Sequence, residues 1–248
     1  MNALPLPTRK SEDWRYADLD ALAELWPLPA AEQITVAAGD SFERAIIIDG
    51  SAGEATVQQI DLTLEAGAKA ALYALNIGGQ YGRIELNITL KKNADFKLGS
   101  AQIGGADQNL EIVTTVTHAE EGGTSQQIVR NVLGSKATGT YLGKVAVARG
   151  AQQTDSEQDV KAMLLDRTAT ANAKPELEIF ADDVKCAHGC AIGELDAMAL
   201  YYLQSRGLHP AEAKKLLLQA FVAGAFDGAA DEEKLQQLAL AKLGELVA

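Results

Sequence analysis

The chain has 248 residues, a length that suits one large domain or a core domain with small appendages. Hydrophobic residues make up 47% of it and aromatic residues only 5%, so a sizeable core must be built from Ala, Leu, Ile and Val. The formal net charge of -12 repels nucleic-acid phosphates and anionic lipid, which argues against nucleic acid and membrane partners.

The N-terminal stretch and the cysteine content indicate a cytoplasmic protein. The N-terminus lacks the uninterrupted apolar run of a secretory signal, and no stretch approaches the roughly 18 apolar residues of a membrane span. Cys186 and Cys190, the only cysteines of the sequence, make a poor disulfide framework. We therefore expect reduced thiols.

Residues 1–38 predict an N-terminal helical or irregular segment. Prolines surround a short helical pattern in SEDWRYADLDALAEL, and Ser11 is the expected N-cap because acidic residues follow it in the first turn. Trp14, Arg15 and Tyr16 form the densest aromatic cluster of the chain. We expect this cluster to anchor the segment on the main domain, and a partner contact is the alternative.

Residues 39–192 predict a strand-rich core. Short β-rich runs such as ERAIIID, YGRIELNITLK and LEIVTTVTH are separated by Gly, Asn and Asp turns, and apolar residues alternate within them. Leu64, Leu90 and Val116 recur every 26 residues, which predicts side chains stacked in neighbouring turns of a solenoid. The alternation also suits an antiparallel sandwich. The small apolar side chains favour a β-helix, because its narrow interior holds few aromatic rings.

Residues 193–248 predict a C-terminal helical subdomain of three helices. The first is expected to end at Gly207, the second to begin with Pro210 in its first turn, and the third to be capped by Asp231. Apolar spacing predicts the packed stripes Leu195, Met198, Ala199, Tyr202 and Leu203, then Ala213, Leu216, Leu217, Ala220 and Phe221, then Leu235, Leu238, Leu243 and Leu246.

Signatures of catalysis are mostly absent from the sequence. No motif for nucleotide binding or nucleophilic catalysis keeps its required spacing. His118 with Glu120 and Glu121 is a candidate metal site, although three polar residues at a strand end usually form a solvated loop. His209 precedes Pro210 at a helix start, where we expect a local capping role.

The stretch ADDVKCAHGCAIGEL holds both cysteines together with His188. In an extended strand, Cys186, His188 and Cys190 would face one side, with successive residues about 6.5 to 7 Å apart. A zinc site needs four ligands, and an all-cysteine iron–sulfur site needs four thiolates, which this chain lacks. It could supply one or two ligands, with a second chain supplying the others. The alternative is a partly buried thiol pair beside a neutral structural histidine.

Three motifs resemble the SufB/SufD family of iron–sulfur cluster assembly proteins. KPELEIFADDVKCAHGCAIGELDAMALYYLQSRGL resembles its C-terminal hallmark, EDWRYADLDAL its N-terminal pattern, and GAQQTDSEQDVKAMLL a segment ahead of its final turns. SufB carries a cluster-ligand cysteine in its β-helix, whereas residues 1–185 of this chain contain no cysteine. The chain is therefore most similar to SufD, although 248 residues is short for the family.

This resemblance implies an architecture and a set of partners. The expected fold is mainly β, a right-handed parallel β-helix with a short N-terminal helical segment and a C-terminal helical subdomain. The expected role is a non-catalytic scaffold that pairs with a SufB-like subunit, or with a second copy of itself when alone. A SufC-like ABC ATPase would bind the C-terminal helices, with contacts at Tyr201, Arg206, Gly207 and Leu208.

The resemblance also implies a cofactor, a transient iron–sulfur cluster at the interface between the two subunits. His188 matches the histidine proposed as an iron ligand in the family. Cys186 is a weaker candidate, and Cys190 is weaker still.

Two other classes of function stay open on the sequence. A β-helix of this size could be a polysaccharide-active enzyme, which requires clustered Asp, Arg or Lys on one face of the solenoid. The other class is a small zinc-binding or redox protein, which a purified monomer retaining stoichiometric zinc would support.

Overall fold

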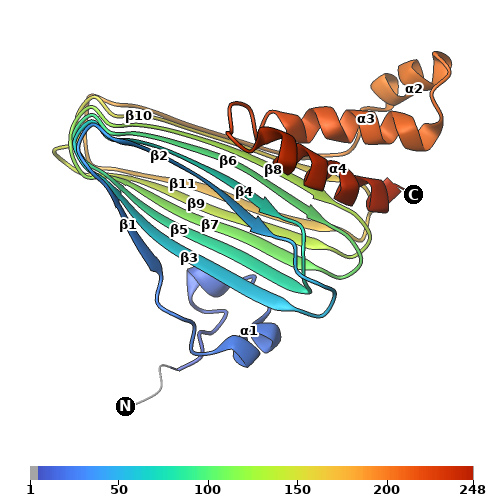
Figure 1. Cartoon of the computed structure of the whole chain (residues 1–248), viewed down its shortest axis with the longest axis horizontal. Helices are drawn as coiled ribbons and strands as arrows, with labels where there is room; N and C mark the ends of the chain where they lie inside the picture. Colours follow the sequence, from blue (N-terminus) through green and yellow to red (C-terminus); the bar gives the residue numbers. More distant parts are fainter. Residues whose placement is uncertain (1–4, 248) are drawn as a thin grey trace.

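The computed structural model describes residues 5–247, and two parallel β-sheets of six strands each dominate this part of the chain (Figure 1). Consecutive strands alternate between the sheets, so each pair makes one turn of a β-helix. The odd-numbered sheet contains β1 (Glu32–Val36), β3 (Ala55–Leu64), β5 (Tyr81–Leu90), β7 (Asn109–His118), β9 (Thr138–Val147) and β11 (Thr170–Ile179). The even-numbered sheet contains β2 (Ser41–Ile48), β4 (Lys69–Asn76), β6 (Asp95–Gly104), β8 (Thr124–Leu133), β10 (Asp155–Leu164) and β12 (Lys185–Gly193).

Short turns close the solenoid where an odd-numbered strand leads into the next even-numbered strand. In the first three of these turns the third residue adopts a positive φ, at Gly39 (+76°), Gly67 (+69°) and Asn93 (+54°). Gly enters this region without steric cost and Asn tolerates it better than most residues. The recurring Gly and Asn of the sequence thus close successive turns. The β-helix is confirmed and the antiparallel sandwich is excluded.

The stacking register agrees with the predicted repeat at two of its three positions. Leu64 lies opposite Leu90 in the neighbouring strand, as expected. Val116 lies opposite Ile88 instead, and His118 takes the place opposite Leu90. The prediction for Val116 is wrong because the step from β5 to β7 is two residues longer than the step from β3 to β5. The apolar alternation is the same in both registers, so it does not reveal the longer step.

Side chains that point inward from both sheets form the main core. Leu62 and Leu86 of the odd-numbered sheet and Leu72 and Leu98 of the even-numbered sheet are buried in it. Most of its members are Ala, Val, Ile or Leu, as the low aromatic content predicts. This close-packed interior leaves alternate residues of each strand facing outward, where the helices cover part of the surface.

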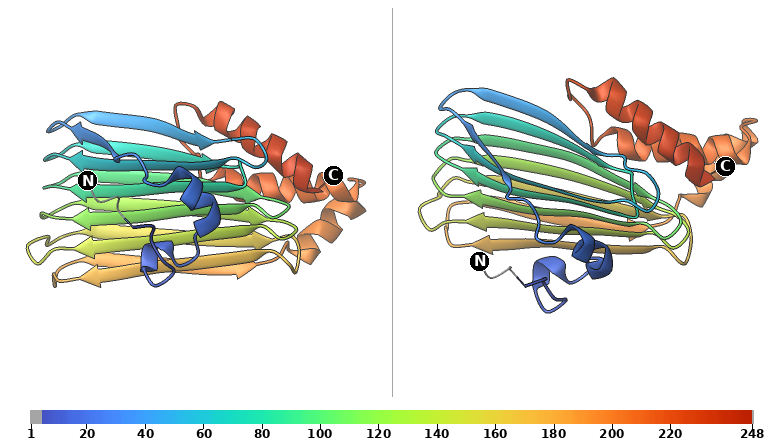
Figure 2. Two further views of the ribbon diagram at one scale, coloured as in Figure 1. Left: turned by 90° about the horizontal axis from the view of Figure 1, so that it is seen from below. Right: turned by 60° about the horizontal axis from the view of Figure 1, so that its bottom comes forward.

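The N-terminal segment lies across the outer face of the odd-numbered sheet (Figure 2). It contains the 3-10 helix η1 (Glu12–Trp14) and the helix α1 (Leu19–Leu25). Strand β1, which belongs to the sheet itself, also begins inside the region expected to be helical or irregular. Ser11 occupies the N-cap position of η1 and acidic residues follow it, as predicted, but its side chain accepts no capping hydrogen bond. Asp18 caps α1 by accepting from the backbone N–H groups of Asp20 and Ala21. The pattern read as one helix is two short ones.

Trp14 anchors this segment, as predicted. Its ring lies 3.9 Å from the guanidinium carbon of Arg83, a residue with no exposed surface. Arg83 also donates to the backbone oxygen of Asp13 and pairs with the buried carboxylate of Glu111 at 3.0 Å. The segment therefore covers a buried ion pair on the outside of the β-helix.

Three helices follow the last strand: α2 (Ala197–Ser205), α3 (Pro210–Ala223) and α4 (Glu232–Val247). Helices α3 and α4 lie along the outer face of the even-numbered sheet (Figure 1). Phe226, in the connection between them, is fully buried there together with Leu235 and Leu243 of α4 and Tyr73 and Leu75 of β4. None of the helices described is long and apolar enough to cross a membrane.

The predicted packing stripes hold for α4 but not for α2 and α3. On α3 the buried residues are Ala213, Leu218 and Val222, whereas Leu216 is 46% exposed. Helix α3 packs against both the sheet and α4, and this turns its buried face away from the strongest apolar stripe. Helix α2 contributes no buried residue at all, and in Figure 1 it lies beyond the end of the sheet.

Candidate functional site

The stretch with both cysteines forms β12, the last strand of the even-numbered sheet. Within residues 5–247, β12 pairs only with β10, and β11 pairs only with β9. Each of these two strands therefore has one edge whose backbone N–H and C=O groups lack a strand partner. We call this region the C-terminal end of the β-helix; its strands are orange in Figure 2.

Register places both cysteines and His188 on the side of β12 that continues the interior. Cys186 lies opposite Ser156, His188 opposite Gln158 and Cys190 opposite Val160. Ser156, Gln158 and Val160 are buried inside the solenoid. No other strand within residues 5–247 stacks on the free edge of β12, so His188 and Cys190 are exposed while Cys186 is half-buried against the core. The three side chains thus occupy one surface, as their spacing predicts.

A polar column runs inward behind Cys186. Ser156 lies next to Cys186, its hydroxyl is 2.8 Å from that of Ser125, and the Ser125 hydroxyl is 2.9 Å from Nε2 of His118. Burial lowers the pKa of His118 to about 4, which keeps its imidazole neutral near pH 7. His118 is therefore a buried partner of this column.

The candidate metal site at His118 is not formed. Glu120 accepts from the backbone N–H of Lys92, and Glu121 forms an ion pair with the Lys92 side chain. Neither carboxylate turns toward the buried ring of His118 to make a cluster, and no group of three His, Cys, Asp or Glu residues suited to a metal occurs in the described part of the chain. His209 has the expected local role, since its ring accepts from the N–H of Ala211 and caps α3.

A second polar column runs inward behind His188. Gln158, adjacent to His188, donates from Nε2 to the hydroxyl of Tyr141 at 3.3 Å. That hydroxyl also lies 3.0 Å from Thr114 and 3.1 Å from Gln127, which precedes Gln158 in the same column. Neither column is predicted by the apolar alternation of the strands.

A sequence signal for these columns exists. SQQIV (125–129) and SEQDV (156–160) share the pattern S-x-Q-x-V, and CAHGC (186–190) occupies the same register on β12. Polar residues at the inward-facing positions of consecutive strands therefore indicate columns that end at the candidate site.

The two thiols do not form a redox pair within the chain. Both cysteines are free, and four residues of extended strand separate their Cα atoms by about 13 Å, beyond the roughly 7 Å limit for a disulfide. Burial raises the pKa of both thiols, and the negative charge of Asp155 raises that of Cys186 further. Thiols with raised pKa values are less nucleophilic near neutral pH, which weighs against a dithiol redox function.

Helix α2 and the turn after it form a second exposed surface. Met198, Tyr201 and Tyr202 lie on one side of α2 and are 73%, 68% and 57% exposed; we call these three residues the α2 face. Arg206 stacks over the ring of Tyr202 at 5.2 Å, and Gly207 adopts a φ of +94° that ends the helix, as predicted. Leu208 follows in the turn before α3, half-buried.

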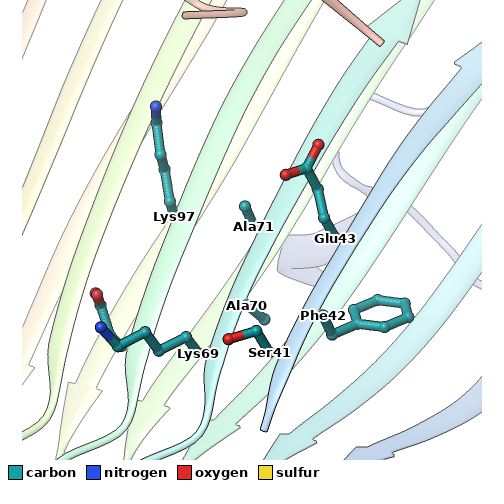
Figure 3. A pocket seen from close by; sticks show the side chains of 8 residues that line it. Ser41, Phe42, Glu43, Lys69, Ala70, Ala71 and Lys97 are labelled. Atoms are coloured by element: carbon teal, nitrogen blue, oxygen red, sulfur yellow. The ribbon is translucent and has the colours of Figure 1, made fainter. Parts of the chain in front are cut away.

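A cavity of about 380 Å³ lies elsewhere, over the first residues of β2, β4 and β6. Figure 3 shows Glu43 and Lys97 on either side of Ala71 in its wall. Their charged groups are already engaged, because Lys97 donates to the backbone oxygen of Asp227 and Glu43 accepts from the N–H of Ala230. These bonds fix the α3–α4 connection to the sheet.

Comparison with known proteins gives one consistent result. The family model described as SUF system FeS cluster assembly, SufBD core domain, matches residues 30–221. The chain is 30% identical to the iron–sulfur cluster assembly protein SufD of Escherichia coli over 186 residues, which cover 75% of this chain and 44% of that protein. It is 29% identical to the chloroplastic protein ABCI7 of Arabidopsis thaliana over 198 residues, covering 79% and 42%.

An iron–sulfur cluster assembly SufBD family protein of Synechocystis is 33% identical over 172 residues, covering 68% of this chain and 38% of that protein. The chain thus spans less than half the length of these curated relatives. The family match extends over all strands of the β-helix, over α2 and over most of α3. With its parallel solenoid and the C-x-H-x-C strand at the end of it, the chain belongs to the SufB/SufD family and is most like SufD.

Proposed function

We propose that the chain is a SufD-like scaffold subunit of the SUF iron–sulfur cluster assembly system. It pairs with a SufB-like subunit, binds a SufC-like ATPase, and contributes His188 to a nascent cluster between the two β-helices. The observation that carries the proposal is the position of His188, exposed on the interior side of the last strand, where the solenoid is open.

The C-terminal end of the β-helix suits pairing with another β-sheet. An open strand edge adds backbone hydrogen bonds with a partner strand, and natural proteins protect such edges with charges or proline. Strand β11 carries Pro175 together with Lys174, Glu176 and Glu178, whereas β12 contains no proline and a single charged residue, Lys185, at its first position. Ile192 on β12 and Phe180 after β11 are 48% and 59% exposed. Strand β12 is therefore the proposed pairing edge.

The cluster is the product of this assembly, and the chain supplies only part of its ligands. A neutral imidazole ligates iron through a ring nitrogen, and thiolates are the usual ligands of iron–sulfur clusters. His188 is the proposed ligand from this chain, with Cys186 as a weaker candidate. The remaining ligands come from the SufB-like partner, since no three ligating side chains converge within residues 5–247.

The α2 face is the proposed contact for the SufC-like ATPase. Three large apolar side chains on one side of a helix that buries nothing in this chain are suited to a groove on a partner. The proposed contacts continue through Arg206, Gly207 and Leu208 to the start of α3. The scaffold itself performs no catalysis, and a cytoplasmic location and a homodimer in the absence of the partner are part of the same proposal.

Reconstitution of the assembled complex tests the role of His188. The His188→Ala variant should fold and pair normally, because exposed side chains away from caps and ion pairs usually change stability by less than about 0.5 kcal/mol. Cluster formation with iron and sulfide, followed by visible absorption, should fall sharply. Cys186→Ser should lower it less, and Cys190→Ser least. Normal cluster formation on the His188→Ala complex would contradict the proposal.

Neither a polysaccharide-active enzyme nor a small zinc-binding or redox protein has a comparable observation in its favour. The charged side chains Arg130, Asp159 and Lys161 on the outside of the even-numbered sheet pair with one another, which is unlike an open cluster of catalytic carboxylates. A zinc site within one chain lacks ligands in the described residues.

A further inference from the structure

Gln158 stands directly behind His188 in the same inward column of the even-numbered sheet. The Gln158 side chain is fully buried, although a Gln inside an apolar solenoid requires hydrogen-bond partners for both ends of its amide. Its Nε2 donates to Tyr141, but its Oε1 is buried without a hydrogen-bond partner among the residues that the structure describes. One strong acceptor is therefore left over beside the exposed imidazole.

The amide cannot easily turn to another partner, because its donor end is held on a rigid support. Tyr141 is fully buried, and its hydroxyl is fixed by Thr114 and Gln127 in addition to Gln158. Two residues further along the same strand, Gly143 leaves room for this hydroxyl, because any Cβ at that position would overlap it. The network thus holds the Gln158 amide in one orientation.

Gln158 has two neighbours in this column, Gln127 on the inner side and His188 on the side of the open end. His188 is the neighbour that can satisfy this acceptor from the open end. It is adjacent to Gln158 in the parallel register, and its ring has no hydrogen bond within the described residues. Neutral imidazole has one N–H donor and one nitrogen lone pair. Histidines that ligate metals usually donate their second ring N–H to a carbonyl or carboxylate, which fixes the tautomer and the ring orientation.

From this geometry we propose that Gln158 is a positioning residue for His188. Its Oε1 accepts the N–H of the His188 imidazole and so directs the lone pair of the other ring nitrogen toward the subunit interface. A buried unpaired carbonyl is unfavourable, so the same bond also satisfies the Gln158 amide. This inference rests on the proposed function of His188 as an iron ligand, and it adds the group that orients the ligand.

The chain offers a well-matched substitution for a test. Residues Leu72 and Leu98 occupy the same column in β4 and β6, so the interior accommodates leucine at this position. Gln158→Leu removes the acceptor with little change in volume, and the Tyr141 hydroxyl keeps Thr114 and Gln127. The control is Ser156→Ala, which alters the column behind Cys186 at the same depth and leaves Gln158 unchanged.

The first measurement is the tautomer of His188 in the full chain, from long-range proton–nitrogen NMR of uniformly labelled protein. In the wild type and in Ser156→Ala, one tautomer should dominate. In Gln158→Leu, the ratio should return to that of free histidine. A free-histidine ratio in the wild type, or an equal change in both variants, would overturn the assignment.

The second measurement is cluster formation on the complex with the SufB-like and SufC-like subunits. Loss of an outer partner of a metal-binding histidine typically lowers metal affinity or activity by about 10- to 100-fold, so Gln158→Leu should show a loss in this range and Ser156→Ala should not. If His188→Ala abolishes clusters while Gln158→Leu forms them normally, the positioning role is wrong. If His188→Ala forms clusters normally, the proposed function fails, and the tautomer measurement still decides whether Gln158 bonds His188.

Discussion

The buried imidazole of His118 should make folding stability depend on pH in a way that one substitution removes. His118 has no exposed surface, its Nε2 contacts the hydroxyl of Ser125, and its Nδ1 has no hydrogen-bond partner. Protonation of this ring inside the solenoid would bury an uncompensated charge. Desolvation therefore lowers its pKa from 6.5 to about 4.

The direction and size of the effect follow from proton linkage. Between pH 6.5 and 4 the unfolded chain binds a proton at His118 that the folded chain does not bind, so the stability contribution is full above pH 6.5 and is lost as the pH falls toward 4. A depression of this size corresponds to a loss of about 3 kcal/mol between pH 7 and pH 4. Other titrating groups add their own dependence, so a matched variant is needed.

His118→Leu is that variant, because Leu90 and Val147 occupy the same position in the neighbouring strands. Ser125 keeps its contact with Ser156 after the substitution. Urea unfolding followed by circular dichroism should show the wild type losing about 3 kcal/mol more than His118→Leu between pH 7 and pH 4. If the free energy of unfolding changes with pH by the same amount in the wild type and in His118→Leu, burial does not hold His118 neutral.

Three further outcomes are expected. Arg83→Met should lower the free energy of unfolding by about 3 to 5 kcal/mol, because it leaves the buried Glu111 carboxylate without its cation. Adding Glu111→Gln should recover part of this loss. Urea unfolding in which the effects of the two substitutions simply add would contradict the prediction. Phe226→Ala should cost about 3 to 5 kcal/mol by opening a cavity between helices and sheet, measured by thermal unfolding. Tyr201→Ser should weaken binding of the SufC-like ATPase in calorimetry while stability stays unchanged; equal affinity would exclude the α2 face.

Much of the fold is encoded locally and could be read from the sequence. Apolar alternation identifies strands, and Gly or Asn in the third position of the first three tight turns, as at Gly67 and Asn93, closes the solenoid there. The strand that presents His188 follows from the same alternation, and its family resemblance follows from the residues around it. Pro210 marks the start of α3 because its missing N–H is not needed there.

Other features depend on contacts between distant parts of the chain, and only the tertiary structure decided them. Val116 stacks on Ile88 because β6 is two residues longer than β4, which shifts the register without changing the apolar alternation. The buried face of α3 is set by two neighbours at once, so Leu216 is exposed and Leu218 is buried. The sequence determined that Cys186, His188 and Cys190 share one side of a strand. That this side continues an interior lined by Ser156 and Gln158 follows from the stacking of strands about 30 residues apart, since parallel pairing joins residues that local patterns treat as independent.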